Sequence, residues 1–170
     1  MKTADAIIET LADYGQLKHV YVLYGAANGD LIDAFTRIRR LKYIAVLHEQ
    51  AGAFMAEVEA KLNGFACMIV TSGPGGQNLM TGIANCYYDS VPVLFITGQV
   101  DSRFMGDGTV RQVGFQENNI VAQVATITKY AVLVKKDVLA QVKQAILDTM
   151  SSRPGPVLLD IPVDIQKVEI

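Results

Sequence analysis

The chain has 170 residues, of which 51% are hydrophobic and 19% are charged, and its formal net charge is -2. That length is typical of one domain with a sizeable core, and the balanced charge argues against nucleic acid as a partner. No segment is long and apolar enough to span a membrane, and the N-terminal stretch "MKTADAIIETLADYG" carries acids that a signal peptide would lack. We therefore expect a soluble, cytoplasmic protein with no membrane partner.

The first seventy residues alternate between helical and strand periodicity. A first helix is marked by Ala4, Ile7, Ile8, Leu11 and Ala12, and the strand "HVYVLYG" follows it and ends at Gly25. A second helix carries Leu31, Ala34, Phe35 and Ile38, and leads to the strand "YIAVL". The third helix is expected to turn one apolar face inward, formed by Ala51, Phe54, Met55, Val58 and Leu62. The strand "FACMIV" closes this half.

The remaining hundred residues continue the alternation. A helix bears Leu79, Met80, Ile83, Ala84 and Tyr87, and the strand "VPVLFITG" ends at Gly98. A polar, glycine-containing loop covers roughly residues 99–117. Two more strands, around "YAVLV" and "GPVLLDIP", flank a helix with Val138, Leu139, Val142, Ala145 and Ile146. The thiols of Cys67 and Cys86 fall in apolar patterns without metal-ligand spacing, and we expect both to be buried and reduced.

Strands that alternate with helices and are themselves almost continuously apolar predict a parallel sheet covered on both faces. The expected fold is α/β, a doubly wound, mainly parallel sheet of about six strands in a single domain over residues 1–170. Ligands of such sheets collect at the carboxyl ends of the strands. The unusual residues of this sequence stand there: Gly25 to Gly29, His48 with Glu49, "TSGPGGQN" from Thr71 to Asn78, and the 99–117 loop.

Two glycine motifs allow different interpretations. "TSGPGGQN" resembles a dinucleotide fingerprint with Asn78 in the place of the third glycine, so a nucleotide-binding domain, an anion-binding turn and a merely tight turn all remain open. "GDG" at residues 106–108 is followed by Asn118 and Asn119, as in a magnesium-diphosphate motif, but the separation is too short for the strand and helix that a parallel crossover needs. We interpret these residues as parts of one loop and expect no metal site in this chain.

"LHEQ" raises the sharpest question, because it ends an apolar strand with two side chains that dislike burial. Glu49 can be explained by the first turn of a helix, where the dipole favours an anion. It can also be explained by a reaction that needs one carboxyl at the edge of a sheet. His48 is as well explained by a core or rim histidine that holds a backbone carbonyl as by catalysis.

Four motifs in order settle which family the chain is similar to: "HEQAGAFMAE", "TSGPGGQNLMTGIANCYYDSVPVLFITGQV", "GFQE" and "RPGPVLLDIPVDIQ". Together they resemble the N-terminal pyrimidine-binding (PYR) domain of thiamine-diphosphate enzymes, most closely the acetolactate synthase-like group, over nearly all 170 residues. The resemblance implies that Glu49 is the catalytic carboxyl that contacts the aminopyrimidine ring of the cofactor. It also implies a cofactor-binding set made of Gly25, Glu49, Thr71, Gly73, Pro74, Gly75 and Asn78.

For Glu49 the resemblance implies acid–base chemistry. A carboxyl that shares a proton with the ring nitrogen favours the imino tautomer, whose exocyclic nitrogen can remove the proton from C2 of the thiazolium ring. Such a carboxyl must be fixed and dry, and burial is expected to raise its pKa. The protein supplies the placement, and the cofactor supplies the electron sink.

The same resemblance places Phe115 and Gln116 at the substrate. Arg111, on the same loop, is explained equally well as a guanidinium that holds an anionic group of the substrate and as a solvated loop charge. Arg153, before "PGP", is interpreted as a structural residue or as a contact to FAD, which leaves FAD open as a second cofactor. The loop before "FQE" is longer and more basic than in typical acetolactate synthases, which leaves the substrate unassigned.

The family implies partners as well. The central domain and the diphosphate-binding (PP) domain, which carries the Mg²⁺ ligands, are absent from this chain, so it is expected to be an excised domain or one subunit of a split enzyme. A second PYR chain and a PP domain would complete a homo- or hetero-oligomer. The favoured function is half of a lyase or carboligase that acts on pyruvate or a related 2-oxo acid. The alternatives are a plain 2-oxo acid decarboxylase subunit and a non-catalytic PYR-type interaction or regulatory domain.

Overall fold

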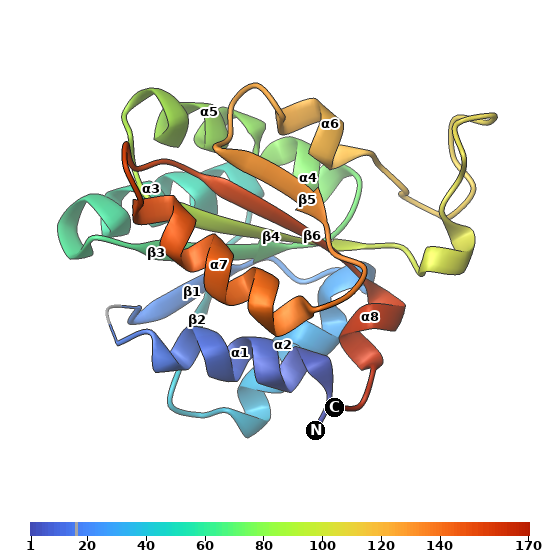
Figure 1. Ribbon diagram of the computed structural model, residues 1–170, viewed down its shortest axis with the longest axis horizontal. Helices are drawn as coiled ribbons and strands as arrows, with labels where there is room; N and C mark the ends of the chain where they lie inside the picture. The colour runs from blue at the N-terminus through green and yellow to red at the C-terminus, as the bar shows by residue number, and fades with distance from the viewer. Residues whose placement is uncertain (16) are drawn as a thin grey trace.

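The computed structural model describes residues 1–15 and 17–170, and its centre is a single sheet (Figure 1). Within those residues six strands pair in parallel in the order β2-β1-β3-β4-β6-β5. The strands are β1 (His19–Val22), β2 (Lys42–Ala45), β3 (Ala66–Val70), β4 (Val93–Gln99), β5 (Tyr130–Leu133) and β6 (Val157–Pro162). The predicted doubly wound α/β sheet is confirmed.

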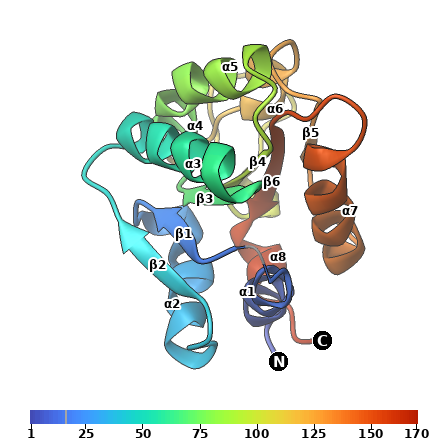
Figure 2. The same ribbon diagram turned by 90° about the vertical axis from the view of Figure 1, so that its left-hand side faces the viewer.

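Helices cover both faces of the sheet (Figure 2). One layer contains α1 (Thr3–Asp13), α2 (Gly29–Arg37), α7 (Val138–Met150) and α8 (Val163–Lys167). The other layer contains α3 (Glu49–Asn63), α4 (Pro74–Asn78), α5 (Met80–Tyr88) and α6 (Ile120–Val124). Short 3-10 turns, η1 (Ala26–Asn28) and η2 (Ser102–Phe104), follow β1 and β4. The five-residue helices α4, α6 and α8 were not predicted, because one turn is too short to show a periodic apolar face.

The central strands supply both hydrophobic cores by alternation. In β3, Cys67 and Ile69 pack into the core beneath α1, α2 and α7, whereas Ala66, Met68 and Val70 pack beneath α3 and α5. Both cysteines are buried free thiols, as expected, and burial raises the pKa of Cys86 to about 12. A strand buried on both faces explains the nearly continuous apolar pattern in the sequence.

The order of the strands sets the position of a ligand crevice. The chain steps outward from β1 to β2, and then crosses back to β3 on the other side of β1. In open parallel sheets the ligand crevice lies where the winding direction changes, outside the carboxyl ends of the two strands concerned. Here those strands are β1 and β3.

The predicted inward face of α3 is wrong. Met55, Val58 and Leu62 are exposed, with Leu62 at 78%, and Ala51 also faces outward while Phe54 is half-buried. The buried positions are instead mostly small residues or acids: Glu49, Gly52, Ala53, Ala56, Glu57, Glu59 and Ala60. The physical reason is close packing, because a side chain on Gly82 of α5 would come within 2.3 Å of the Cβ of Ala53.

The two chain ends lie together (Figure 1). The Met1 ammonium donates to the carbonyl of Ile170 (3.2 Å), and the Ile170 N–H donates to the carbonyl of Met1 (2.9 Å). Lys2 and Glu169 also form an antiparallel bridge. Among the described residues, no helix is both long and apolar enough to cross a membrane.

Candidate functional site

At the crevice, the ends of β1 and β3 touch through Gly25 and Thr71. A Cβ on Gly25 would lie 2.5 Å from the Cβ of Thr71, so a side chain has no room at position 25. The Thr71 hydroxyl accepts a hydrogen bond from the N–H of Ala27 at 3.1 Å. These two predicted residues therefore close one side of the site.

The "TSGPGG" segment forms a turn that only glycine fits. Gly73 has φ 58° and ψ -118°, a conformation that L side chains rarely adopt. Pro74 follows as the first residue of α4, where the missing N–H costs nothing. A Cβ on Gly75 would lie 2.9 Å from the Thr71 methyl group. The turn is therefore closely packed, with Gly75 against Thr71 and Gly73 against Gln116.

Glu49 is the first residue of α3 and is only 7% exposed. One carboxylate oxygen, Oε2, accepts a hydrogen bond from Nδ2 of Asn78 at 3.0 Å. The other, Oε1, lies 3.5 Å from the position that a Cβ on Gly75 would take, so it faces the glycine turn. The carboxylate is thus held by one amide at the place where the strand ends converge.

His48 caps α3. Its Nδ1 accepts a hydrogen bond from the N–H of Gln50 at 3.2 Å, and its side chain is exposed. An imidazole acceptor at this position satisfies one of the free N–H groups of the first helical turn. The sequence interpretation expected a bond to a backbone carbonyl, whereas the observed partner is a backbone N–H; a catalytic role of His48 stays untested.

The substrate-side loop is brought to the site at one residue. Gln116 is half-buried with φ 62°, and its carbonyl oxygen would lie 2.7 Å from a Cβ on Gly73. Phe115, beside it, is 81% exposed. Arg111 is exposed. The loop that carries it extends away from the sheet (Figure 1). Gln116 therefore joins the cluster directly, and Arg111 does not.

Arg153 lies at the amino ends of the strands, just before the start of β6, whereas Glu49 lies at their carboxyl ends. Its guanidinium donates to the Ser90 hydroxyl (2.7 Å) and to the Tyr88 carbonyl (3.2 Å). These bonds tie the turn after α5 to the turn before β6. The structure does not bring Arg153 to Glu49.

The "GDG" segment has internal partners. The carboxylate of Asp107 accepts from the N–H and the hydroxyl of Thr109, and the N–H of Gly106 donates to Glu117. The bonds from Thr109 lower the pKa of Asp107, and the N–H of Val113, followed by that of Gly106, lowers the pKa of Glu117. Across residues 1–15 and 17–170, no group of three His, Cys, Asp or Glu side chains is placed to hold a metal ion.

Three residues that shape this region were given no role by the sequence interpretation, namely Asn28, Gln166 and Gly98. Asn28 is buried; its Oδ1 accepts from the N–H of Gly25 (2.8 Å) and its Nδ2 donates to the carbonyl of Leu23 (2.9 Å). Gln166 donates to the carbonyl of Ala27 at 2.8 Å. A Cβ on Gly98 would lie 1.9 Å from that carbonyl oxygen. Asn28 could have been suspected as a polar residue just before a helix; Gln166 gave no such signal.

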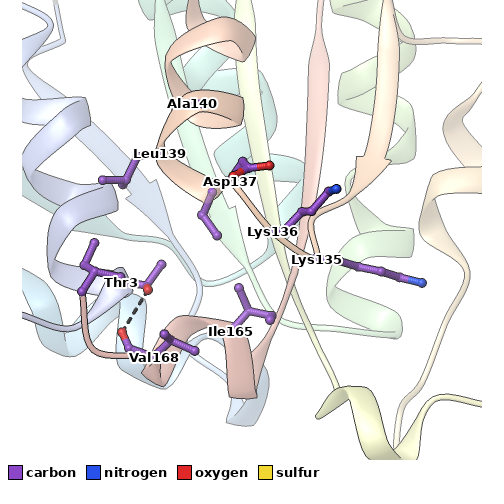
Figure 3. A pocket seen from close by; sticks show the side chains of 10 residues that line it. Thr3, Lys135, Lys136, Asp137, Leu139, Ala140, Ile165 and Val168 are labelled. Atoms are coloured by element: carbon purple, nitrogen blue, oxygen red, sulfur yellow. Dashed lines mark hydrogen bonds between the residues drawn. The ribbon is translucent and has the colours of Figure 1, made fainter.

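A cavity of about 510 Å³ lies elsewhere, between α1, α7 and α8 (Figure 3). Aliphatic side chains of Leu139, Ile165 and Val168 surround it, and Lys135 and Lys136 extend to one side. None of the predicted site residues lines this cavity. It is separate from the crevice at Glu49.

The site offers one buried carboxylate as an acceptor, beside glycines that pack closely on Thr71. Gly25, Thr71, Gly73, Gly75 and Asn78 carry no positive charge that would hold a phosphate. A ring nitrogen that carries or shares a proton is the natural partner of the carboxylate.

Comparison with known proteins agrees with this chemistry. The family model "Thiamine pyrophosphate enzyme, N-terminal TPP binding domain" matches residues 1–125. The chain is 40% identical over 169 residues to acetolactate synthase 2 of Nicotiana tabacum, with 98% of this chain and 24% of that protein covered. It is 39% identical over 169 residues to acetolactate synthase of Arabidopsis thaliana, again with 98% and 24% covered. It is 37% identical over 164 residues to the acetolactate synthase large subunit of Haemophilus influenzae, with 95% and 28% covered. The chain thus spans about a quarter of the length of these relatives.

Proposed function

The chain belongs to the thiamine pyrophosphate enzyme family, as its N-terminal TPP-binding domain, and from this premise we propose that it is the pyrimidine-binding half of an acetolactate synthase-like carboligase. The proposed substrate is pyruvate or a related 2-oxo acid. The observation that carries the proposal is Glu49, a buried carboxylate at the start of α3, held by Asn78 beside the glycine turn.

In this proposal Glu49 shares a proton with the pyrimidine nitrogen of the cofactor. Its backbone is fixed by the first turn of α3, and its side chain by the amide of Asn78, so that little reorganisation is needed when the proton moves. The bound cofactor would supply the carbon nucleophile and the electron sink. Asn78 thus holds the carboxylate, and its predicted contact with the cofactor stays part of the proposal.

Gln116 is proposed to face the substrate. An amide can donate a hydrogen bond to a carboxylate or ketone oxygen without transferring a proton to carbon, which favours joining two substrates over releasing an aldehyde. Its carbonyl oxygen packs on Gly73, so its position is coupled to the glycine turn. Phe115 and Arg111 would line the approach to the site.

The proposal includes partners. The outer face of α3, formed by Met55, Val58 and Leu62, is apolar and exposed, and it borders a groove of about 540 Å³. An acidic side chain lies under this groove: Glu59 is buried, its Oε2 accepts from the Tyr21 hydroxyl, and its Oε1 has no hydrogen-bond partner among the described residues. An apolar face of this kind suits a second PYR chain or a PP domain, with the Mg²⁺ and diphosphate ligands on the PP domain. Homo- or hetero-oligomers are both compatible with this arrangement.

The bonds of Arg153 support the structural interpretation over the FAD contact. Two of its nitrogens donate to Ser90 and Tyr88, at the amino ends of the strands and away from Glu49. An FAD-containing protein would have to place the flavin at that end of the sheet. Cytoplasmic location remains part of the proposal.

The proposal is tested by Glu49→Gln in the full-length natural protein, together with whatever partner supplies the PP domain. We expect the exchange of the C2 proton of bound cofactor to slow by ~10²–10⁴-fold, because the amide cannot take up the shared proton. Glu57→Gln is the matched control, since Glu57 lies two turns further along α3 and pairs with Lys61 at 2.7 Å. Equal exchange rates in wild type and Glu49→Gln would refute the assignment.

Product analysis with pyruvate as the sole substrate separates the alternatives. Acetolactate supports carboligation, whereas acetaldehyde alone indicates a plain decarboxylase. Tight cofactor binding without any turnover of a panel of 2-oxo acids would favour the interaction or regulatory domain.

A further inference from the structure

The loop that carries Gln116 is attached to the sheet at both ends. It leaves the sheet after Gln99 at the end of β4 and returns at Asn118, just before α6. Near its start, Asp164 accepts from the N–H (2.9 Å) and the hydroxyl (3.1 Å) of Ser102. Between these ends, the carboxylate of Glu117 accepts hydrogen bonds from the N–H groups of Gly106 and Val113, so the loop folds onto itself. The attachment near Gln116 depends on Gln99.

Gln99 is 1% exposed, and its amide is fully engaged. Nε2 donates to the carbonyl of Asn118 (2.7 Å) and to Oδ2 of Asp160 (2.8 Å), while Oε1 accepts from the N–H of Val100 (2.9 Å). Since the Val100 N–H can donate only to the oxygen, the NH₂ group must face the two acceptors. The orientation of this amide is therefore determined by its surroundings.

Asp160 is the residue that holds this amide in place. It lies on β6, paired with Thr97 of β4, and is buried. Its Oδ1 accepts from the Thr97 hydroxyl at 2.6 Å, and its Oδ2 accepts from Gln99. Burial raises the pKa of Asp160 to about 7, although both hydrogen bonds oppose that shift. A buried carboxyl needs these donors, so Gln99 cannot turn away without leaving it unsatisfied.

The contacts continue from Gln99 to the crevice. Asn118 stands two residues after Gln116, and Gln116 has a left-handed backbone (φ 62°) with its carbonyl against Gly73. A glutamine in that conformation is strained and needs its neighbours to hold it. Gly73 in turn is two residues from Gly75, beside which Glu49 Oε1 lies.

We infer that Gln99 is a positioning residue: held by the buried Asp160, it binds the carbonyl of Asn118 and so fixes Gln116 over the glycine turn. The structural part of this inference concerns the chain alone. Its consequence for the reaction rests on the proposed function, in which Gln116 faces the substrate.

The decisive experiment is hydrogen exchange in the full-length natural protein, measured on peptides that cover residues 112–119. Gln99→Met keeps the length of the side chain and removes its donors, so we expect exchange in this segment to quicken by about tenfold, the equivalent of one lost hydrogen bond. Thr97→Val is the matched control: it removes the other donor to Asp160 without touching the loop, and exchange over 112–119 should stay at the wild-type rate. Equal rates in Gln99→Met and Thr97→Val would overturn the inference.

Two further variants guard against a folding defect. Gln99→Asn keeps an amide that is one methylene too short to reach both Asp160 and Asn118, and it should loosen the loop in a protein that still folds. Asp164→Asn weakens the attachment at Ser102 and should quicken exchange only near residues 100–104. Loosening over 112–119 in Asp164→Asn, or none there in Gln99→Asn, would contradict a specific role for Gln99.

Kinetics then test the consequence for the reaction. With a 2-oxo acid substrate, Gln99→Asn should raise KM by about tenfold while C2 proton exchange stays near the wild-type rate, because Glu49 is untouched. A looser loop with unchanged KM would show that the position of Gln116 does not limit substrate binding. Absence of 2-oxo acid turnover in the wild-type protein would refute the proposed function, whereas the exchange experiment would still decide the positioning.

Discussion

The two helices that cover opposite faces of the sheet bury different side chains. On α7 the buried residues include Val142, Ala145 and Ile146. On α3 they include the smaller Gly52, Ala53 and Ala56. The larger apolar residues of α3 point outward instead. The buried polar residues also differ, since Thr97, Gln99 and Asp160 lie on the α3 side of the sheet by the alternation of β4 and β6. The α7 layer is thus packed with larger aliphatic side chains, whereas α3 packs through small residues and leaves its larger apolar side chains exposed.

The largest difference between the two layers is expected in the pH dependence of folding. Asp160 has a folded-state pKa of about 7, raised by burial above its unfolded value. Between about pH 4 and 7 the unfolded chain ionises this carboxyl and the folded chain does not, so stability is lost as the pH rises. Asp160→Asn removes this term, and its stability relative to wild type should rise on the order of 4 kcal/mol from pH 4 to pH 8.

Denaturant unfolding of the chain at a series of pH values measures this effect. Asp33→Asn is the control on the α2 side, because Arg37 lowers the pKa of this exposed carboxyl and the change should have the opposite sign and a small size. A constant difference between Asp160→Asn and wild type across the series would mean that Asp160 is already ionised in the folded protein at low pH.

The next largest effect is expected from a methyl group between α3 and α5. Gly82→Ala places a Cβ at 2.3 Å from the Cβ of Ala53, and neither atom belongs to a flexible side chain. The helices must separate, at a cost of about 3 kcal/mol in the free energy of unfolding.

Gly29→Ala is the matched change in the other layer. Its Cβ would meet only the Tyr24 ring, at 3.7 Å, and alanine is the better helix former, so stability should be equal or up to about 1 kcal/mol higher. If Gly82→Ala were as harmless as Gly29→Ala, the close approach of α3 to α5 would not be a feature of the protein.

The smallest effect on the free energy of unfolding is expected from two valines, one on α7 and one on α3. Val142→Ala on α7 removes two fully buried methyl groups and should cost about 2 kcal/mol. Val58→Ala on α3 removes two from a residue that is 56% exposed, and should change the stability of the chain by less than about 0.5 kcal/mol. Thermal and denaturant unfolding of both variants would show the contrast. A cost at Val58 equal to that at Val142 would mean that the outer face of α3 is covered in the chain itself.

Much of the fold followed from the sequence because its signals are local. Six apolar strands, helices between them and glycines at strand ends are properties of short segments, and they placed Glu49 and Thr71 at one edge of the sheet. The faces of α3 did not follow. Periodicity shows that Met55, Val58 and Leu62 share a face, but it cannot show whether that face meets the sheet or another surface.

The finer contacts of the site were beyond the sequence because they join distant residues. The hydrogen bond from the amide of Asn78 to Glu49, 29 residues away, could not be read from the sequence. Gln99 and Asp160 are 61 residues apart, and only the pairing of β4 with β6 brings them together. Arg111 and Gln116 share a loop in the sequence, but only Gln116 reaches the glycine turn, because the fold of the loop separates them.

The meeting of the chain ends makes the connectivity of this domain nearly a ring. Since Met1 and Ile170 already hydrogen-bond to each other, a short linker could join them without moving a strand. The ring could then be opened at Gly108, which has a left-handed backbone and no neighbour within 4 Å of its would-be Cβ. In such a permuted chain β5 and β6 would leave the ribosome before β1 to β4, although every strand would keep the same neighbours. The order of synthesis of the six strands is therefore separable from their order in the sheet.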